Sequence, residues 1–514
     1  MHVKVVRKGT QFSPDPTRII PRFLFTSQHR SIEIIRAVLA MSDNEVTHAL
    51  NPLLRDFSTR HRNITRTFEK HIEKLSDIFN QLEIDVNALS FSRKALIGSC
   101  FTAEYSIESV AFYNPSIIED PDQSELNKDE KRVILSFRAT GEGNISSIVF
   151  RSGVLDRNNN LTIEPVGRML AEADVINRHV YNKKSFQVKL GEMQDEENAI
   201  SPAFILDKLG DTFTYGELMR SLKDATETNL LPEKMLINQA MWLASTHYEL
   251  DFSIDSSISE RVIFPISKSE QKGIEDARFV KFTDDNGDTF YYATYTANDG
   301  VTIMPKLIKT TDFFHFEVMP MYGEIVSNKG MALFPRKING KYAMLCRVDG
   351  VSNFIAYSDT INIWREAKLL QQPKYPWELL QIGNAGSPIE TDAGWLIITH
   401  AVGPMNKRVI SAALFELDNP EKEIGRLNVP LIMPNETERE GSVPNAIFSC
   451  GSIIHGKELI IPYAMSDHTS TYATVNLNEL LNELKGIENT SHNIVLGSID
   501  KRASIDNERE MRVA

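Results

Sequence analysis

The chain has 514 residues, of which 42% are hydrophobic and 9% aromatic, so it can bury a large core. Its formal net charge is −13 and no basic stripe offsets it, which argues against a nucleic-acid partner. Three cysteines, Cys100, Cys346 and Cys450, are too few and too scattered for a disulfide framework or a zinc site, and they fit a reducing compartment.

The hydropathy pattern gives no sign of a membrane partner. The first twenty residues lack a continuous apolar run, so we expect no secretion signal, and no later stretch reaches transmembrane length. We therefore expect a cytoplasmic protein.

Residues 31–110 show a helical pattern, with apolar residues recurring at i, i+3, i+4 and i+7. We predict a helical extension over residues 1–110. Its basic clusters, at residues 60–62 and 93–94, are expected to be solvated helix faces, because charge runs on helices usually face water.

From about Phe112 to Leu484 a different module recurs five times, at a period of roughly 50 residues. Each copy holds a short apolar strand, a polar turn, a second strand rich in Tyr, Phe, Leu and Ile, and a third strand. The turns at residues 285–287, 339–340 and 392–394 contain Asn, Asp and Gly, which tolerate the positive φ of tight hairpins.

Repeated blades of this kind predict an all-β five-bladed β-propeller with added helical segments. The second helical block, residues 203–247, interrupts the repeats. The resulting organisation is an N-terminal helical extension (1–110), a first blade region (111–200), a helical insertion (201–250), the remaining blades (251–484) and a polar tail (485–514). We expect the two helical blocks to pack together on the propeller's side and to support a homo-oligomer.

Two adjacent carboxylates, Glu275 and Asp276, lie at the start of the second blade. Neighbours in an extended strand point to opposite faces, so one of the two should face the axial funnel. The alternative is that the aspartate has only a local role, in an ion pair with Arg278 or a hydrogen bond with a turn amide.

Several cations recur near the blade ends of this acidic protein and would suit an anion such as phosphate, because Arg and Lys make charge-assisted hydrogen bonds to its oxygens. Each of them could instead satisfy a local carbonyl or carboxylate. They are Arg138, Lys329, Arg336, Lys337, Arg347, His400 and Arg408. No metal-site motif, nucleotide-binding loop or serine-hydrolase elbow is present, and we predict no metal.

Nine segments, taken in order across residues 112–484, resemble glycoside hydrolase family 130, the propeller family of β-mannoside phosphorylases and related hydrolases. They are AFYNPSII, LSFRATGEG, GIEDARF, MALFPRKINGKYAMLCR, FIAYSDTINIW, IGNAGSPIETDAGWLIITHAVG, ALFELDNPEKEIGR, REGSVPNAIFSCG and IPYAMSD. The helical blocks lie outside the family's minimal propeller.

The resemblance implies an inverting attack of inorganic phosphate, as co-substrate, on a terminal β-mannosyl unit of a mannoside or mannooligosaccharide. The product would be α-mannose 1-phosphate, with no other cofactor. Asp276 matches the family's proton donor in G-x-x-D-P-R, where the proton is thought to pass through a sugar hydroxyl. The family's positions around the mannosyl ring are matched by Asn114, Arg138 and Asp467. We also expect the aromatic rings of Tyr295 and Phe334 to contact the sugar.

For phosphate, Lys329, Arg347 and His400 match the family's binding positions. This sequence departs from the family pattern at five positions. It has Gly330 where Asn or Asp is usual, Gln381 where Lys is expected, and Arg408 where Tyr is expected. It also has Ala277 in place of the motif's proline and Ser442 where Asp is common. Arg408 can replace a lost cation.

Three functions remain open. Phosphorolysis is favoured. A β-mannosidase using water would need a base, for which Glu275, Glu378 and Glu440 are possible sources. A non-catalytic sugar-binding propeller is the third, and the retained Asp276 argues against it.

Overall fold

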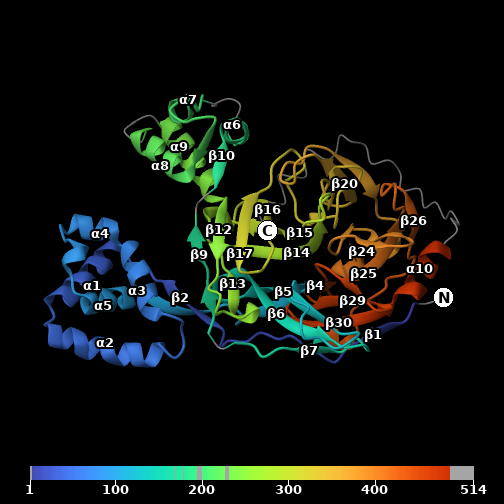
Figure 1. Ribbon diagram of the computed structural model, residues 1–514, viewed down its shortest axis with the longest axis horizontal. Coiled ribbons are helices and arrows are strands. Elements are labelled where there is room, and N and C mark those ends of the chain that lie inside the picture. The colour runs from blue at the N-terminus through green and yellow to red at the C-terminus, as the bar shows by residue number, and fades with distance from the viewer. Residues whose placement is uncertain (1–2, 168, 177–178, 194–199, 226–230, 487–514) are drawn as a thin grey trace.

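The computed structural model describes residues 3–167, 169–176, 179–193, 200–225 and 231–486. Strands dominate this part of the chain, and two groups of helices lie outside the sheets (Figure 1). None of the helices that the model describes is long and apolar enough to span a membrane. The predicted tail beyond residue 486 lies outside the described residues.

We number the large sheets 1 to 5 in chain order. Sheets 1 and 2 are joined by a single residue pair, Ser146 with Gly273. Sheet 1 contains β4 (Ala111–Glu119), β5 (Lys131–Thr140) and β6 (Ser146–Leu155), with the short strands β7 (Leu161–Ile163), β13 (Arg261–Ile263) and β8 (Ala171–Glu172) at its side. Sheet 2 contains β14 (Gly273–Thr283), β15 (Thr289–Asn298), β16 (Ile303–Thr310) and β17 (His315–Pro320), followed by β12 (Tyr248–Asp251) and β9 (Asp174–Ile176) at its outer edge.

The remaining three sheets follow in chain order. Sheet 3 contains β18 (Ala332–Leu333), β19 (Tyr342–Cys346), β20 (Asn353–Ser358) and β21 (Ala367–Gln371). Sheet 4 contains β22 (Gln381–Asn384), β23 (Ile389–Thr391), β24 (Gly394–Val402), β25 (Arg408–Phe415) and β26 (Glu423–Arg426). Sheet 5 contains β27 (Ile447–Phe448), β28 (Ile453–His455), β29 (Glu458–Met465) and β30 (Thr469–Asn476), with β1 (Val5–Arg7) from the other end of the chain.

The predicted turn residues have the backbone that tight hairpins require. Asn339 and Gly340 both have positive φ, at 50° and 77°, and Gly287 has a φ of 88°. These values lie in the left-handed region, where Asn and Gly are least costly. The turn chemistry read from the sequence is therefore confirmed at these positions.

Apolar side chains alternate between the two faces of the strands and fill the spaces between neighbouring sheets. On β5, Val133 and Leu135 pack toward sheet 5, whereas Ile134 packs toward sheet 2. On β24, Trp395 packs toward sheet 3 and Leu396 toward sheet 5. Another cluster joins sheets 2 and 3. The period of two along a strand thus gives each sheet two buried faces.

The N-terminal segment joins sheet 5 to sheet 1. Its strand β1 pairs with β30, and Lys8 Nζ donates to Asn158 O at 3.1 Å in the loop after β6. Phe12 packs on Phe137 of β5 with ring centroids 4.9 Å apart. Residues 1–110 are therefore not only a helical extension, because their first strand completes a sheet.

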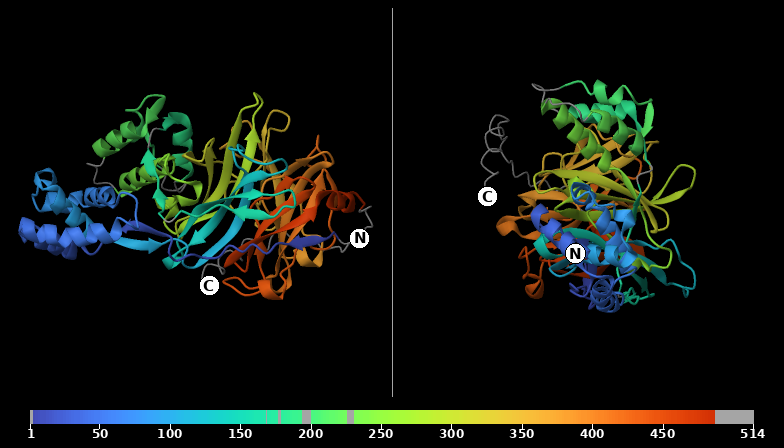
Figure 2. Two further views of the ribbon diagram at one scale, coloured as in Figure 1. Left: turned by 60° about the horizontal axis from the view of Figure 1, so that its bottom comes forward. Right: turned by 90° about the vertical axis from the view of Figure 1, so that its left-hand side faces the viewer.

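The two predicted helical blocks form separate lobes, so the prediction that they pack together is wrong (Figures 1 and 2). The N-terminal lobe contains α1 (Gln28–Ala40), α2 (Asp43–Phe57), α3 (Ile64–Glu73), α4 (Ser76–Gln81) and α5 (Phe91–Cys100), joined to the sheets by β2 (Ile19–Phe23) and β3 (Thr102–Ser106). The insertion lobe contains β10 (Val180–Asn182), α6 (Lys183–Glu192), α7 (Ala203–Leu206), β11 (Thr212–Thr214), α8 (Tyr215–Ala225) and α9 (Leu231–Ser245). The hydrophobic clusters of the two lobes share no residue.

The insertion begins earlier than predicted. Tyr181 and Phe186 belong to the same hydrophobic cluster as the helices that follow residue 201. Helix α10 (Leu477–Gly486) packs through Leu480 and Leu484 between sheets 4 and 5. Short 3-10 turns complete the fold: η1 (Val86–Ala88), η2 (Glu142–Asn144), η3 (Ile258–Glu260), η4 (Lys268–Glu270), η5 (Pro376–Glu378), η6 (Pro404–Asn406) and η7 (Glu436–Glu438).

The basic clusters of the N-terminal lobe are paired locally. Arg60 Nε lies 2.7 Å from Glu104 Oε1, and Arg62 Nη2 lies 2.8 Å from Glu260 Oε2. Arg93 Nη1 donates to the carbonyl of Val38 at 2.6 Å, at the end of α1. The prediction of solvated helix faces is wrong for residues 60–62, because they lie in the loop between α2 and α3 and His61 is buried. Arg93 lies on α5 but is mostly buried by its contacts with the end of α1.

Candidate active site

A bulge in β14 sets the position of the predicted proton donor. The register of β14 with β15 shifts between Glu275 and Arg278, and Asp276 adopts a left-handed backbone with φ 58°. Arg138 Nη2 lies 3.1 Å from Glu275 Oε1, and Arg138 Nη1 lies 3.4 Å from Asp276 Oδ1. The expectation that these two carboxylates serve opposite faces is therefore wrong, because the bulge breaks the alternation of the strand.

The same irregularity recurs in the first strand of sheet 1. The register of β4 shifts between Tyr113 and Ser116, and Asn114 has a φ of 50°. Its side-chain amide donates to Asp276 Oδ1 at 2.6 Å. Asp467, after β29, has a φ of 51°. Asn114, Asp276 and Asp467 thus come from three different sheets, and each has a left-handed backbone, which Asn and Asp tolerate.

The pKa values of Asp276 and Asp467 are shifted in opposite directions. Burial by itself raises the pKa of Asp276, but the charge of Arg138, the hydrogen bond from Asn114 and the charges of Lys329 and Arg278 lower it below its usual value. The pKa of Asp467 is raised, first by burial and then by the charge of Asp276. Asp276 is consequently ionised at neutral pH in the free protein.

Asp276 and Arg278 do not form the local ion pair considered as the alternative. Arg278 Nη1 donates to Asn384, at 2.9 Å to the backbone carbonyl and 2.5 Å to Oδ1. Lys329 Nζ lies 2.5 Å from Glu275 Oε2. The structure thus adds Arg278 to the candidate site residues that the sequence predicted. The sequence signal that could have indicated it is its position two residues after Asp276, in the same short motif.

The cations expected to bind phosphate influence one another and Asp276. The pKa of Arg347 falls to about 10, first through burial and then through the charge of Arg278, with Arg408 acting in the same direction and Asp276 opposing it. The pKa of His400 lies well below its usual value, first through burial and then through Arg347 and Arg278. His400 is therefore neutral, and its Nδ1 lies 2.9 Å from the carbonyl of Asn384, which accepts its hydrogen.

Two of these cations have no partner in the part of the chain that the structure describes. Among the described residues, the side chains of Arg347 and Arg408 make no hydrogen bond or ion pair, and the Nε of each is buried. An unpartnered guanidinium in a partly desolvated place is costly. An oxyanion would satisfy both groups, because Arg donors match its geometry.

The two aromatic residues expected at the sugar differ. Tyr295 lines a narrow cavity together with Asp276, but its hydroxyl donates to Glu270 Oε1 at 2.7 Å. Phe334 is fully buried, with its ring edge-to-face on Trp395 at 5.0 Å. The prediction that Phe334 contacts sugar is wrong, because the sheet 3 to sheet 4 core covers the whole ring. The residues lining that cavity are Asp276, Arg278, Thr294, Tyr295, Thr296, Pro305, Asn328, Gly330 and Met331.

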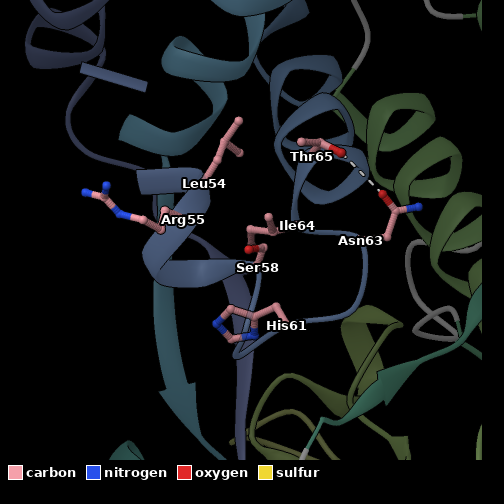
Figure 3. Close-up of a pocket in the computed structure, with 7 residues that line it drawn as sticks. All are labelled: Leu54, Arg55, Ser58, His61, Asn63, Ile64 and Thr65. Carbon is pink, nitrogen blue, oxygen red and sulfur yellow. Dashed lines mark hydrogen bonds between the residues drawn. The ribbon is translucent and has the colours of Figure 1, made fainter. Parts of the chain in front are cut away.

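A wider, open concavity of about 420 Å³ lies in the N-terminal lobe, between α2 and α3 (Figure 3). It is lined by Leu54, Arg55, Ser58, His61, Asn63, Ile64 and Thr65. His61 Nε2 lies 2.8 Å from Glu104 Oε1, so its ring is held by a local contact. None of the predicted site residues lines this concavity.

Several known proteins are similar to this chain. A family model described as beta-1,4-mannooligosaccharide phosphorylase, of glycoside hydrolase family 130, matches residues 252–486. A 1,2-beta-oligomannan phosphorylase from Thermoanaerobacter sp. is 32% identical over 223 residues, which cover 42% of this chain and 72% of the relative. A beta-1,2-mannobiose phosphorylase from Listeria innocua is 26% identical over 351 residues, covering 65% and 91%.

A solved structure of a beta-1,2-mannobiose phosphorylase from Listeria innocua aligns with 73% of this chain and 92% of its own, at 20% identity and a TM-score of 0.44. The family match begins before β14, includes Asp276 and the cation cluster of sheets 3 and 4, and ends with α10. The chain belongs to glycoside hydrolase family 130.

Proposed function

We propose that the protein is an inverting phosphorylase that cleaves terminal β-mannosides with inorganic phosphate and releases α-mannose 1-phosphate. The observation that carries this proposal is the pair of unpartnered arginines, Arg347 and Arg408, beside His400 and Asp276. Phosphorylases among the relatives support the reaction class. No cofactor other than phosphate enters the proposal.

We also propose that the five sheets form the blades of a closed propeller. Hydrophobic clusters join sheet 1 to 2, 2 to 3, 3 to 4, 4 to 5 and 5 to 1, which is a cyclic order. The pairing of β1 with β30 supports closure, because a strand from the N-terminus completes the last sheet. The proposed funnel is where residues of sheets 1, 2 and 5 meet.

Each side chain at the site has a proposed role. Arg347, Arg408 and His400 bind the phosphate, with Lys329 at the edge of the cluster through its ion pair with Glu275. Asp276 supplies the proton. The mannosyl ring is bound by Asn114, Arg138 and Asp467, and the ring of Tyr295 forms one wall.

The reaction forms one bond and breaks one. A phosphate oxygen attacks the anomeric carbon on the face opposite the leaving group, and the glycosidic C–O bond breaks with its electrons passing to oxygen. That oxygen takes a proton that originates on Asp276, and Asp276 regains a proton from the hydrogen phosphate. An anionic nucleophile needs no general base, unlike the water of an inverting hydrolase.

Phosphate also changes the protonation of Asp276. In the free protein the charges of Arg138, Lys329 and Arg278 lower the pKa of this carboxyl. A bound dianion would offset that positive charge, and the pKa would rise. Binding of phosphate would thereby help to load the acid that the reaction requires.

The second candidate is a β-mannosidase that uses water. Of its possible bases, Glu275 is held by Arg138 and Lys329, and Glu378 is buried with Arg426 Nη1 3.3 Å away, while Glu440 is exposed. Asp467 is a further candidate, because its raised pKa depends partly on Asp276 and places it near the acid. This observation keeps hydrolysis as the alternative.

A product assay distinguishes the two. The full chain is incubated with β-1,2- and β-1,4-mannobiose, with and without phosphate, and products are separated by anion-exchange chromatography. Phosphorolysis predicts mannose 1-phosphate that depends on phosphate. Free mannose at equal rates with and without phosphate would identify a hydrolase.

A further inference from the structure

Two histidines and a glutamate meet where the insertion lobe joins sheet 2. His179 directly precedes β10, at the start of the lobe, and His247 directly precedes β12, at its end. Glu317 lies on β17, which pairs with β12 so that Glu317 stands opposite Glu249. Residues far apart in the sequence therefore converge at both chain connections of the lobe.

The geometry of this cluster suits a metal ion. One ligand atom from each of His179, His247 and Glu317 lies within 4.8 Å of the others. His247 Nε2 is 3.3 Å from Glu317 Oε1, and the two imidazole rings are stacked with centroids 3.3 Å apart. Donors bound tetrahedrally to zinc at about 2.0–2.1 Å are roughly 3.3 Å apart, so a small adjustment of His179 completes three-fold coordination.

The chemistry of the donors agrees with this geometry. Two imidazole nitrogens and one carboxylate oxygen are donor types that zinc binds in proteins. Across the strand pair, Glu249 adds a carboxylate, and Asp251 lies 2.5 Å from His315 Nδ1 on the same pair of strands. On the other side of β17, Lys309 of β16 stands opposite Glu317, so the strand neighbours of the cluster carry both signs of charge.

We propose that His179, His247 and Glu317 bind a divalent cation of the zinc class, which fixes both ends of the insertion lobe to sheet 2. Imidazole nitrogen favours such borderline metals over magnesium or calcium, which prefer oxygen. Strand β17 is three strands from β14, which carries Asp276, so the site is separate from the proposed catalytic centre and has a structural role. Water would occupy the remaining coordination position.

The test uses the full chain, freed of metal with EDTA and then dialysed. Equilibrium dialysis with zinc chloride should give one zinc per chain, and cobalt chloride should give visible absorption bands of a tetrahedral site. His179→Ala and the nearly isosteric Glu317→Gln should each weaken zinc binding at least tenfold. His48→Ala, which removes an exposed histidine of α2, is the matched control and should bind as the wild type does.

Limited trypsin digestion gives a readout independent of affinity. Zinc should slow cleavage within residues 179–247 of the wild-type and His48→Ala chains, and it should have no effect on Glu317→Gln. No zinc uptake by the wild-type chain, unchanged affinity in both ligand variants, or tighter binding of magnesium or calcium than of zinc would each overturn the proposal.

Discussion

The left-handed backbone at Asp276 determines which groups its carboxylate meets. In a regular strand, Glu275 and Asp276 would lie on opposite faces, but the bulge brings both to Arg138. Asn114 uses the same device in β4 and donates to Asp276. Backbone irregularity at both positions therefore assembles the acid and its partners.

At this scale, Asp276→Asn should lower kcat by about 10²–10⁴-fold, because it removes the proton and nearly preserves the shape. The melting temperature should stay close to that of the wild type. Asp285→Asn, which changes an exposed turn carboxylate paired with Lys337, is the control and should retain activity. Turnover of the Asp276 variant within a few fold of wild type would show that another group donates the proton.

Arg408→Ala tests the unpartnered cations. Loss of one charge-assisted contact, worth about 1.5–3 kcal/mol, should raise the KM for phosphate roughly 10- to 150-fold. Without phosphate the variant should be no less stable than the wild type, since the removed charge has no partner among the described residues. Arg365→Ala, at an exposed arginine, is the control, and an equal effect there would argue against a phosphate site at Arg408.

Among the elements, the helices of the N-terminal lobe depend on a close crossing at Gly98 of α5. A Cβ on Gly98 would lie 2.3 Å from the backbone oxygen of Phe68 on α3, and backbone cannot move aside as a flexible side chain can. By contrast, a Cβ on Gly216 of α8 would meet nothing within 4 Å.

Gly98→Ala should therefore lower the free energy of unfolding by about 1–3 kcal/mol, through overpacking. Gly216→Ala should raise it by up to about 1 kcal/mol, because alanine favours a helix. Urea unfolding followed by circular dichroism measures both. If the two substitutions had the same sign, the crossing of α3 and α5 would not be as close as described.

Acid sensitivity of the same lobe is expected from His71 on α3. Burial, then the charges of Lys74 and Lys70, lowers its pKa from 6.5 to about 4. The unfolded chain thus binds a proton that the folded chain does not, and stability contributed by this histidine is complete above pH 6.5 and falls as the pH drops toward 4.

His71→Gln should flatten this dependence by up to about 1.4 kcal/mol per pH unit within that window. Urea unfolding at half-unit steps between pH 4.5 and 7.5 tests this. His48→Gln serves as the exposed control, with a slope like that of the wild type. An unchanged slope in the His71 variant would show that this ring does not stay neutral in the folded state.

For the whole molecule, sheet order and charge together predict that phosphate stabilises the fold. Arg347 and Arg408 come from sheets 3 and 4, so an anion between them would link the two sheets. A ligand at one hundred times its Kd should add about 2.7 kcal/mol. The melting temperature should rise along a phosphate series at fixed ionic strength, and less with sulfate. No rise in the wild type, together with free mannose as product, would favour hydrolysis.

By itself, the sequence determined the strand repeats, the hairpin turns at Asn339 and Gly340, the two helical blocks, and a short set of candidate catalytic and ligand-binding residues. These features depend on local spacing, which a single chain records directly.

Only the tertiary structure decided the rest. The meeting of Glu275 with Asp276 at Arg138, the burial of Phe334, the place of β1 in sheet 5 and the separation of the helical lobes all depend on contacts between distant segments. The cluster of His179, His247 and Glu317 has no motif spacing for the same reason. Side-chain partners are set by which strands pair and where a strand bulges, and residue spacing along one chain does not specify either.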